Sequence, residues 1–237
     1  MKKMIEVKNV TKKYGSKTAL RDINLDIETG KIIGVIAPNG AGKTTLLKLI
    51  AGLIYPNSGE VLIDGKTKTV ETKKIISYSP DCMMFSDYEK VSGILDFYEN
   101  FFEDFNRKKA EELLNKIHVE QGERIGMLSK GKKELLQMFL VLSRDARIYI
   151  LDEPLASVDP ANREYLINTI LREYKENATV IIATHLVADV ENILDDVIIL
   201  KDQKLFCYES VDKIKEEEGK SLNEYFKSAF RVDIEKV

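Results

Sequence analysis

The sequence has little of what a disulfide framework, a thiolate metal site or a histidine metal site would need. Two of its 237 residues are cysteines, Cys82 and Cys207, and two are histidines, His118 and His185. The cysteines form no CxxC or other metal-like spacing, and a reducing compartment fits them best. Two histidines are too few for a histidine-based metal site. Any bound metal is therefore expected to have oxygen ligands.

Long apolar runs are also missing. The runs Met138–Leu142 and Val180–Ala183 are far shorter than the roughly 20 residues that a membrane-spanning helix requires. The first ten residues include four charged side chains, so they lack the unbroken apolar core of a secretion signal. We therefore expect a soluble, cytoplasmic chain.

The composition indicates a folded protein without a general affinity for polyanions. Hydrophobic residues make up 44% of the chain and charged residues 32%. This length and composition suffice for one large globular unit or two closely packed subdomains. The net charge is -3 and the isoelectric point is near 5.7, so nucleic acid and anionic lipid are not attracted overall. No nucleic-acid partner is expected.

The first third of the chain has the alternating pattern of β-strands. Apolar residues alternate at Ile5/Val7, at Ile23/Leu25/Ile27 and at Val61/Ile63, and glycines separate these stretches. We expect a mostly antiparallel sheet here. Between these strands, the apolar stretch Ile32–Ala37 is followed by a glycine-bearing loop and a helical pattern over Thr45–Ala51. This order predicts a buried strand, a loop and a helix.

The rest of the chain changes character twice. From about Tyr88 the apolar residues recur at helical spacing, which predicts an inserted helical subdomain. Two buried strands at 148–151 and 180–183 then flank a predicted helix at 163–174, and this alternation is typical of a parallel sheet covered by helices. A closing hairpin is predicted at 197–201 and 204–208, followed by a charged helical tail from about Ser210.

A phosphate-binding loop joins the predicted strand to the predicted helix. It consists of Ala37, Pro38, Asn39, Gly40, Ala41, Gly42, Lys43, Thr44 and Thr45. Successive backbone N–H groups can face a triphosphate only where the chain curls tightly, which Gly40 and Gly42 permit. Lys43 supplies a charge for the outer phosphates, and the Thr44 hydroxyl is a hard oxygen ligand for Mg²⁺. The segment therefore predicts a site for ATP and Mg²⁺.

The loop departs from the usual motif at its first position, where Ala37 replaces glycine. If that position requires a left-handed backbone, alanine costs about 1–2 kcal/mol. That free energy corresponds to about tenfold in affinity. Under this condition we expect a weakened site that still binds nucleotide.

Two adjacent acids, Asp152 and Glu153, follow the apolar stretch Ile148–Leu151. Neighbouring carboxylates at the end of a buried strand repel each other unless they share a cation or a proton. A magnesium ion beside Asp152, with Glu153 as the general base for a water molecule, accounts for both acids.

With these motifs in place, the sequence resembles the ATP-binding cassette family over nearly its whole length. The matching elements occur in the family's order: Tyr14, which would stack on adenine, the phosphate loop, Leu128-Ser129-Lys130-Gly131-Lys132 in place of the signature LSGGQ, Asp152/Glu153, Ser157-Val158-Asp159 and Thr184-His185. The resemblance implies an α/β fold with a P-loop NTPase (RecA-like) core, an antiparallel β-subdomain and an inserted helical subdomain. It implies an ATPase domain over 1–209, with the helical subdomain at about 88–145, and a helical tail over 210–237.

The resemblance also implies partners. Two cassettes of the family meet head to tail, as a homodimer or a heterodimer, and each ATP lies between the phosphate loop of one cassette and the signature of the other. Ser129, Gly131 and Asp159 would then join the nucleotide site, and His185 would contact the γ-phosphate and orient the water. A separate integral membrane subunit would hold the cassettes at the inner face of the cell membrane.

The signature and its neighbours carry further expectations. A helix predicted over Lys132–Leu142 would present Ser129 and the N–H groups near Gly131 at its N-terminus, a natural anion site. Lys130 and Lys132 replace a glycine and a glutamine, and either add charge beside the γ-phosphate or are simply solvated. His118 is expected to be inert.

Asp81 is the second departure from the family pattern. In Tyr78-Ser79-Pro80-Asp81 the family usually ends with glutamine, which touches Mg²⁺ and the nucleophilic water. Asp81 can still accept a water or a metal. Together with the altered signature, this stretch resembles cassettes of a bacterial subgroup whose membrane partners are of the ABC-2 type, often linked to export.

An apolar docking surface is expected close by. Its candidate members are Met83, Met84, Phe85 and part of the aromatic cluster Phe97, Tyr98, Phe101, Phe102 and Phe105. So many aromatic residues cannot share one helical stripe, so we expect some of them to receive a helix of the membrane subunit. The alternative is that they all pack the core of the helical subdomain.

Three other functions compete with this interpretation. A GTPase or small-molecule kinase would need its own recognition elements, and no Asn-Lys-x-Asp stretch occurs. A soluble cassette ATPase acting on DNA or ribosomes would usually carry coiled-coil arms, a second cassette or a basic face. A degenerate, regulatory cassette that binds ATP without turnover stays open because of Ala37, Asp81 and the altered signature, although Glu153 and His185 favour the enzyme.

Overall fold

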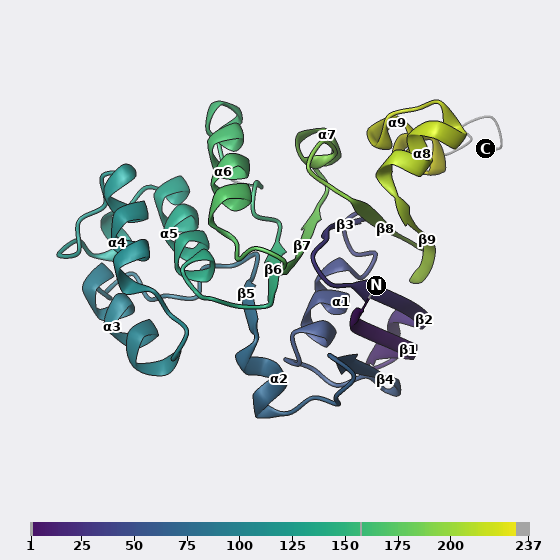
Figure 1. Ribbon diagram of the computed structural model, residues 1–237, viewed down its shortest axis with the longest axis horizontal. Coiled ribbons are helices and arrows are strands. Elements are labelled where there is room, and N and C mark those ends of the chain that lie inside the picture. Colours follow the sequence, from purple (N-terminus) through teal and green to yellow (C-terminus); the bar gives the residue numbers. More distant parts are fainter. Residues whose placement is uncertain (1, 157, 231–237) are drawn as a thin grey trace.

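The computed structural model describes residues 2–156 and 158–230. Its first layer is a three-stranded antiparallel sheet in the order β2-β1-β4 (Figure 1). The strands are β1 (Lys3–Tyr14), β2 (Lys17–Glu28) and β4 (Ser58–Ile63). Ile5 pairs with Ile27 of β2 and with Ile63 of β4, so the alternating apolar residues gather on one buried face. The predicted antiparallel sheet is confirmed.

A second sheet of six strands forms the centre of the molecule, in the order β5-β6-β7-β3-β8-β9. The strands are β3 (Ile32–Ile36), β5 (Ile76–Ser79), β6 (Ile148–Asp152), β7 (Thr179–Thr184), β8 (Asp196–Lys201) and β9 (Lys204–Ser210). All neighbours are parallel except β8 and β9, which form the predicted hairpin. Strands β3, β6 and β7 are buried throughout, as expected for a parallel sheet covered on both faces.

The two faces of this sheet belong to different cores. Ile33 and Val35 of β3 pack into a core shared with the antiparallel sheet and with α1 (Lys43–Ile50), which lies between the sheets (Figure 1). Ile32 and Ile36 face the opposite way, into a second core. That core is covered by α6 (Pro160–Glu173), α7 (Val187–Val190), α8 (Val211–Glu218) and α9 (Leu222–Ala229).

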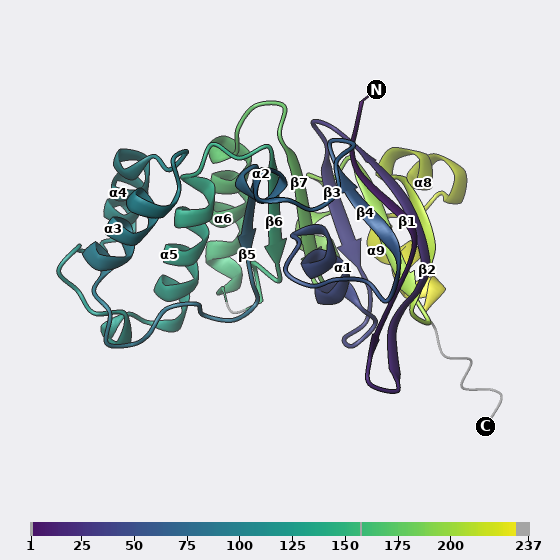
Figure 2. The ribbon, with the colours of Figure 1, turned by 90° about the horizontal axis from the view of Figure 1, so that it is seen from below.

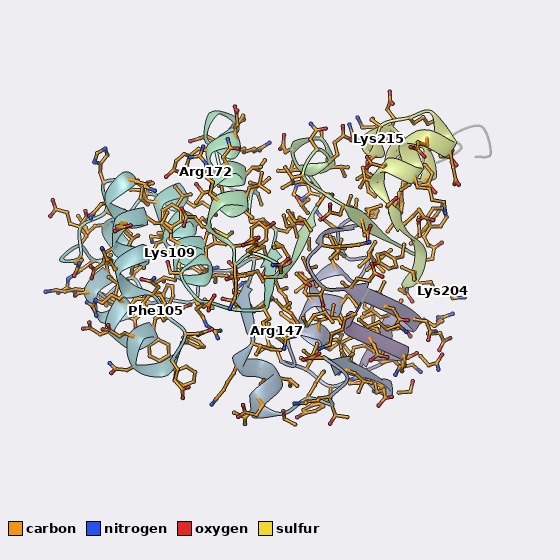
Figure 3. The ribbon with its side chains drawn as sticks, in the orientation of Figure 1. Phe105, Lys109, Arg147, Arg172, Lys204 and Lys215 are labelled. Atoms are coloured by element: carbon orange, nitrogen blue, oxygen red, sulfur yellow. The ribbon has the colours of Figure 1, made fainter. Side chains whose placement is uncertain are left out.

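The helical subdomain lies at the end of the molecule opposite the antiparallel sheet (Figure 2). It contains α3 (Val91–Phe101), α4 (Arg107–Lys116), the 3₁₀ turn η1 (Ile125–Met127) and α5 (Lys130–Leu142), which share a third apolar core. Lys109 of α4, labelled in Figure 3, donates to the carbonyl of Leu142 at 2.8 Å and pairs with Glu173 of α6 at 3.4 Å. The subdomain is therefore fastened to the sheet-bearing part of the chain. The predicted fold class is confirmed.

Helix α2 (Val70–Lys74) and the C-terminal helices differ from what the sequence indicated. Helix α2 was not predicted from the sequence, and it is held by a capping box between Thr69 and Thr72. In the tail, Leu222 is buried and Tyr225 packs against the second core, so α8 and α9 belong to the folded body. Residues 231–237 of the expected tail lie outside the described residues. Within the described part of the chain, no helix is long and apolar enough to cross a membrane.

Candidate active site

The phosphate loop connects the end of β3 to the start of α1. Gly40 and Gly42 have left-handed backbones, with φ of 78° and 109°. A Cβ added to Gly42 would lie 2.7 Å from Cδ2 of Leu20 and 2.8 Å from the carbonyl oxygen of Ala19, so both conformation and space require glycine there. Helix α1 begins at Lys43 without a side-chain cap. Its first N–H groups are thus available to an anion.

Ala37 corrects one expectation. Its side chain is fully buried, and it is not one of the described residues with a positive φ. Weakened binding is expected only if this position requires a left-handed backbone. The backbone is not left-handed, so that reason for a weakened site does not apply. The Ala37 carbonyl instead accepts a hydrogen bond from Nζ of Lys43 at 2.9 Å.

A surface groove of about 370 Å³ runs along the loop. Its lining includes seven of the predicted nucleotide-binding residues, Tyr14, Asn39, Gly40, Gly42, Lys43, Thr44 and Thr45, with the predicted metal ligand Asp81, the predicted base Glu153, and Lys17 and Ala19. The Tyr14 ring is half-exposed at the end of β1, and Nζ of Lys12 lies over it, 5.2 Å from the ring centroid. Pro38 is exposed on the loop, and Ala41 packs partly against the core, so these two are loop residues that do not line the groove.

Glu153 and His185 meet at the carboxyl edge of the central sheet. Glu153 follows β6 with a left-handed φ of 51°, and its N–H donates to the carbonyl of Ala183 at 2.8 Å. Its Oε2 lies 2.9 Å from Nδ1 of His185 and accepts from the His185 N–H at 3.3 Å. Left-handed backbones at non-glycine residues cluster at functional sites. The strain is maintained here by contacts to β7 and to the residue that follows it.

Lys43 completes this group from the opposite side. Its side chain is 6% exposed, and its Nζ lies 3.3 Å from Oε1 of Glu153. The two carboxylate oxygens of Glu153 therefore face different partners, Lys43 on α1 and His185 after β7. The imidazole is half-exposed and does not itself line the groove of the phosphate loop. One base, one cation and one imidazole converge where a phosphate chain would lie along the loop.

Asp152 is held in a different environment. It is 1% exposed, and neither carboxylate oxygen has a hydrogen-bond partner among the described residues. Burial raises the pKa of Asp152 to about 6; the Thr44 hydroxyl opposes this shift, and the charges of Asp81 and Glu153 reinforce it. The nearby Tyr78 hydroxyl is likewise buried without a partner in that part of the chain. Burial, followed by the charge of Asp152, raises the pKa of Tyr78.

These residues fit a magnesium ion. The described residues contain no group of three or more acidic, histidine or cysteine side chains that could hold a metal alone. Mg²⁺ in nucleotide sites is usually bound by one or two protein ligands together with phosphate oxygens. Asp152 has two unsatisfied oxygens, Thr44 stands beside it, and Asp81 lines the same groove. The donor set is entirely oxygen, the kind of ligand that Mg²⁺ prefers.

The signature lies outside this groove. Helix α5 begins at Lys130, two residues before the predicted start, so Ser129 is its N-cap and accepts from the Lys132 N–H at 3.4 Å. An added Cβ at Gly131 would meet no described atom within 4 Å, so the backbone there is open. Nζ of Lys132 donates to the His118 carbonyl at 2.7 Å. Lys132 is thus engaged within its own subdomain.

The segment after Glu153 is only partly described. Ser157 lies outside the described residues. Val158 is buried, and Asp159 occupies the N-cap position of α6 without a side-chain cap bond. Asp159 is exposed and does not line the groove of the phosphate loop. The structure thus brings Asp81, Asp152 and Glu153 to the phosphate loop, whereas Ser129, Gly131 and Asp159 lie elsewhere on this chain.

Gln137 is a contributor that the sequence reasoning missed. It lies on α5 and is 5% exposed. Its Nε2 donates to the carbonyl of Pro80 at 2.8 Å, and its Oε1 accepts from the N–H of Met84 at 3.1 Å. The side chain therefore fixes the loop that carries Asp81 to the signature helix. One amide within the apolar run 135–142 was the signal that could have revealed it.

Comparisons with known proteins agree with this geometry. A model of the ABC transporter family matches residues 20–156. The chain is 30% identical over 217 residues to the ABC transporter ATP-binding protein YtrB of Bacillus subtilis (strain 168), covering 90% of this chain and 74% of that protein. A solved ATP-binding subunit of an ABC transporter superposes with a TM-score of 0.84 at 22% identity, over 96% of this chain and 100% of the other.

A second solved structure is that of MJ0796, a dimeric bacterial ABC transporter cassette. It superposes with a TM-score of 0.75 at 26% identity, over 87% of this chain and 98% of that one. The phosphate loop, the acid pair at the end of β6 and the histidine after β7 thus occur in a chain whose sequence and fold both match one family. The protein belongs to the ABC transporter family and is an ATP-binding cassette with ATPase activity.

Proposed function

We propose that this cassette binds and hydrolyses MgATP to drive a separate integral membrane subunit. The observation that carries the proposal is the convergence of Lys43 and His185 on the two oxygens of Glu153. The carboxylate is held ready to accept a proton from the attacking water. Lys43 and the N–H groups at the start of α1 bind the phosphates. Mg²⁺, held by Asp152 and Thr44 with Asp81 nearby, would neutralise phosphate charge.

Replacing the base tests the assignment. Glu153→Gln should retain ATP binding and lower turnover at least about a hundredfold, the lower limit for loss of a general base. Glu60→Gln, at an exposed glutamate of β4, is the matched control and should retain full turnover. Unchanged turnover in Glu153→Gln would refute the role. Absence of turnover in the native chain would favour the regulatory, non-hydrolysing cassette.

We propose that the working unit contains two cassettes, from two copies of this chain or from this chain and a relative. The start of α5, with the exposed Ser129 at its cap and open space beside Gly131, is suited to a phosphate bound on a second cassette. Asp159 would lie at the same contact. With MgATP, Glu153→Gln should elute as a dimer from size exclusion, whereas without nucleotide it should elute as a monomer. A monomer under both conditions would contradict the pairing.

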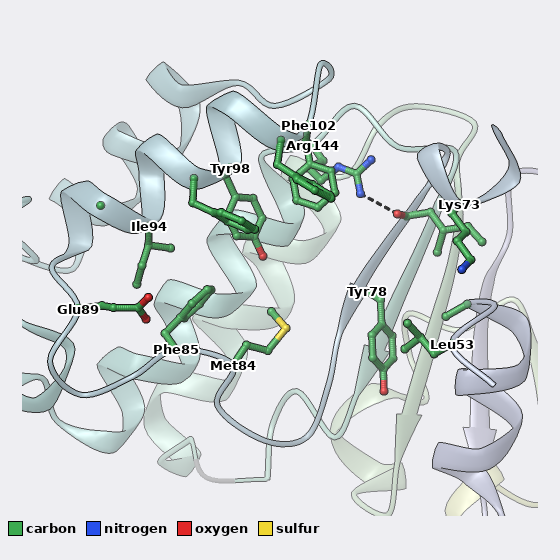
Figure 4. Close-up of a pocket in the computed structure, with 15 residues that line it drawn as sticks. Leu53, Lys73, Tyr78, Met84, Phe85, Glu89, Ile94, Tyr98, Phe102 and Arg144 are labelled. Atoms are coloured by element: carbon green, nitrogen blue, oxygen red, sulfur yellow. Dashed lines mark hydrogen bonds between the residues drawn. The ribbon is translucent and has the colours of Figure 1, made fainter. Parts of the chain in front are cut away.

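The membrane subunit is proposed to dock in a groove between α3, β5 and the loop after α1 (Figure 4). The groove measures about 530 Å³ and is lined by apolar residues including Leu53, Tyr78, Met84, Phe97 and Phe101. Phe101 is 68% exposed and stacks on Phe97 with ring centroids 5.5 Å apart. Flexible methionine and flat rings can bury much apolar area against a partner helix.

The expected docking residues divide among three environments. Met84, Phe85, Phe97, Tyr98, Phe101 and Phe102 line the groove. Met83 lines a smaller groove beside Asp152 instead, and Phe105 packs against the core of the helical subdomain. The docking surface is therefore proposed without Met83 and Phe105.

Charge introduced into the groove tests the docking. Met84→Glu and Phe101→Glu should keep the cooperative melt and basal ATP turnover but abolish co-purification with the multi-span membrane subunit of the host. Tyr88→Glu is the control, because Tyr88 is 83% exposed and does not line the groove. Retention of the subunit by both groove variants would exclude this surface. Purification with DNA or ribosomes instead would favour a cassette that is not linked to transport.

We further propose that the complex is an exporter of the ABC-2 type, on the basis of Lys130 in the signature and the Pro80-Asp81 pair. The chain would then lie on the cytoplasmic face of the membrane through its partner. Residues 1–209 are proposed as the ATPase domain, with the helical subdomain at about 88–145, and 210–237 as a C-terminal helical tail. Transport into or out of vesicles containing the assembled complex would decide the direction.

A further inference from the structure

Tyr78 connects the proposed docking groove to the proposed ion site. It lies on β5, and its ring forms part of the groove wall between Leu53 and Met84 (Figure 4). Its hydroxyl is directed away from Arg144 and is buried. An apolar wall does not require a hydroxyl, and a buried tyrosine hydroxyl usually has a hydrogen-bond partner.

The strand register identifies what the hydroxyl reaches. Tyr78 of β5 pairs with Ile150 of β6, and Asp152 lies two residues further along β6. Side chains alternate along a strand, so Ile150 and Asp152 lie on the same sheet face as Tyr78. A rise of about 3.3 Å per residue and a strand spacing of about 4.8 Å put neighbours offset by two residues about 8 Å apart, which a long tyrosine side chain can span. The tyrosine hydroxyl thus extends along the sheet toward the carboxylate.

Both ends of this juxtaposition are unsatisfied. In the described part of the chain, four buried side-chain polar atoms have no hydrogen-bond partner: the Tyr78 hydroxyl, the two Asp152 oxygens and the Ser143 hydroxyl. Three of the four therefore belong to this one pair. Such atoms are rare in folded proteins and are usually explained by a bound water or ion. An ionised carboxylate only accepts hydrogen bonds, so in a bond between the two groups the Tyr78 hydroxyl is the donor.

We propose that Tyr78 is a positioning residue whose hydroxyl donates a hydrogen bond to the Asp152 carboxylate when that carboxylate holds its ion. The inference rests on the proposed function, since it takes Asp152 as a ligand of Mg²⁺. The bond orients the carboxylate toward the ion, as partners of metal ligands generally do. Because the same side chain forms the groove wall, the docking surface and the ion site share one residue.

The test measures metal retention rather than turnover. Mn²⁺ replaces Mg²⁺, a non-hydrolysable ATP analogue is bound, and free Mn²⁺ is followed by electron paramagnetic resonance. Tyr78→Phe removes one oxygen and should weaken Mn²⁺ binding about tenfold, the range for a hydrogen bond to a charged group. Analogue binding without metal should stay within about twofold of the native value. Tyr98→Phe makes the same change in the same groove, on the helical subdomain, and should match the native protein.

Two comparisons make the result decisive. If Asp152→Asn weakens Mn²⁺ binding but Tyr78→Phe does not, the Tyr78 inference fails and the ion site stands. If Asp152→Asn has no effect either, the proposed ion site itself fails. A purely structural tyrosine would lower the melting temperature of the metal-free protein and leave Mn²⁺ binding unchanged. We expect weaker Mn²⁺ binding and an unchanged melting temperature, because the hydroxyl has no partner among the described residues to lose.

Discussion

The raised pKa of Asp152 should make this residue's own contribution to the stability of the metal-free cassette less favourable at neutral pH than at mildly acidic pH. The carboxyl has a pKa of about 6 in the folded protein, against an ordinary 3.8, because it is buried. Between those values the folded state binds more protons than the unfolded state, so stability falls as pH rises through this window. This shift lowers the free energy of unfolding by about 3 kcal/mol once Asp152 is ionised in both the folded and the unfolded state. Between pH 4.5 and 7.5 the loss is about 2 kcal/mol.

Asp152→Asn removes the titrating group and should therefore gain stability relative to the native chain as pH rises. Urea unfolding in EDTA at pH 4.5 and 7.5 would measure the difference between the two proteins at each pH. We expect that difference to grow by about 2 kcal/mol in favour of the asparagine variant. Asp202→Asn, in the exposed β8–β9 turn, is the control and should show no such growth. A constant difference for Asp152→Asn would refute the argument.

Two further predictions concern the residues that depart from the family pattern. Asp81→Asn should raise the Mg²⁺ concentration needed for half-maximal turnover and leave metal-free ATP binding unchanged, because Asp81 lines the nucleotide groove. If the Mg²⁺ curves of the two proteins superimpose, Asp81 is an ordinary surface acid. Ala37→Gly should not tighten ATP binding in titration calorimetry, because no left-handed strain is relieved. It should lower the free energy of unfolding by about 0.5–1 kcal/mol, because a buried methyl group is lost and glycine is more flexible in the unfolded chain. Tighter binding would show that the loop changes conformation on binding ATP.

The elements with strong periodicity could be predicted from the sequence. Strand β3 is five buried residues in a row, and α3 carries Val91, Ile94, Leu95 and Tyr98 on one buried stripe. Helix α2 escaped prediction because it spans five residues and contributes little apolar surface. Its formation depends on the reciprocal cap between Thr69 and Thr72, which involves side-chain hydrogen bonds and no hydrophobic pattern.

The start of α5 shows a similar limit. The sequence predicted a start at Lys132, but the helix begins at Lys130 because Ser129 supplies the cap. The shift adds two residues to the first turn. Lys130, Gly131 and Lys132 become the first turn of the helix. The Lys132 N–H donates to the Ser129 hydroxyl, so the N–H groups of Lys130 and Gly131 are the ones left without an intrahelical partner.

The contacts inside the site could not be predicted, although the residues could. Glu153 ends β6, His185 follows β7, and Lys43 starts the helix after β3. They meet only because the sheet order puts β7 between β6 and β3. Chain order does not determine that arrangement, since β3 precedes both other strands by more than a hundred residues.

The ion pair between Lys43 and Glu153 has a consequence for nucleotide binding. A triphosphate must compete with the carboxylate for the same ammonium group. We therefore expect phosphate binding to draw Lys43 from the general base and to leave Glu153 with His185, the partner that follows the neighbouring strand.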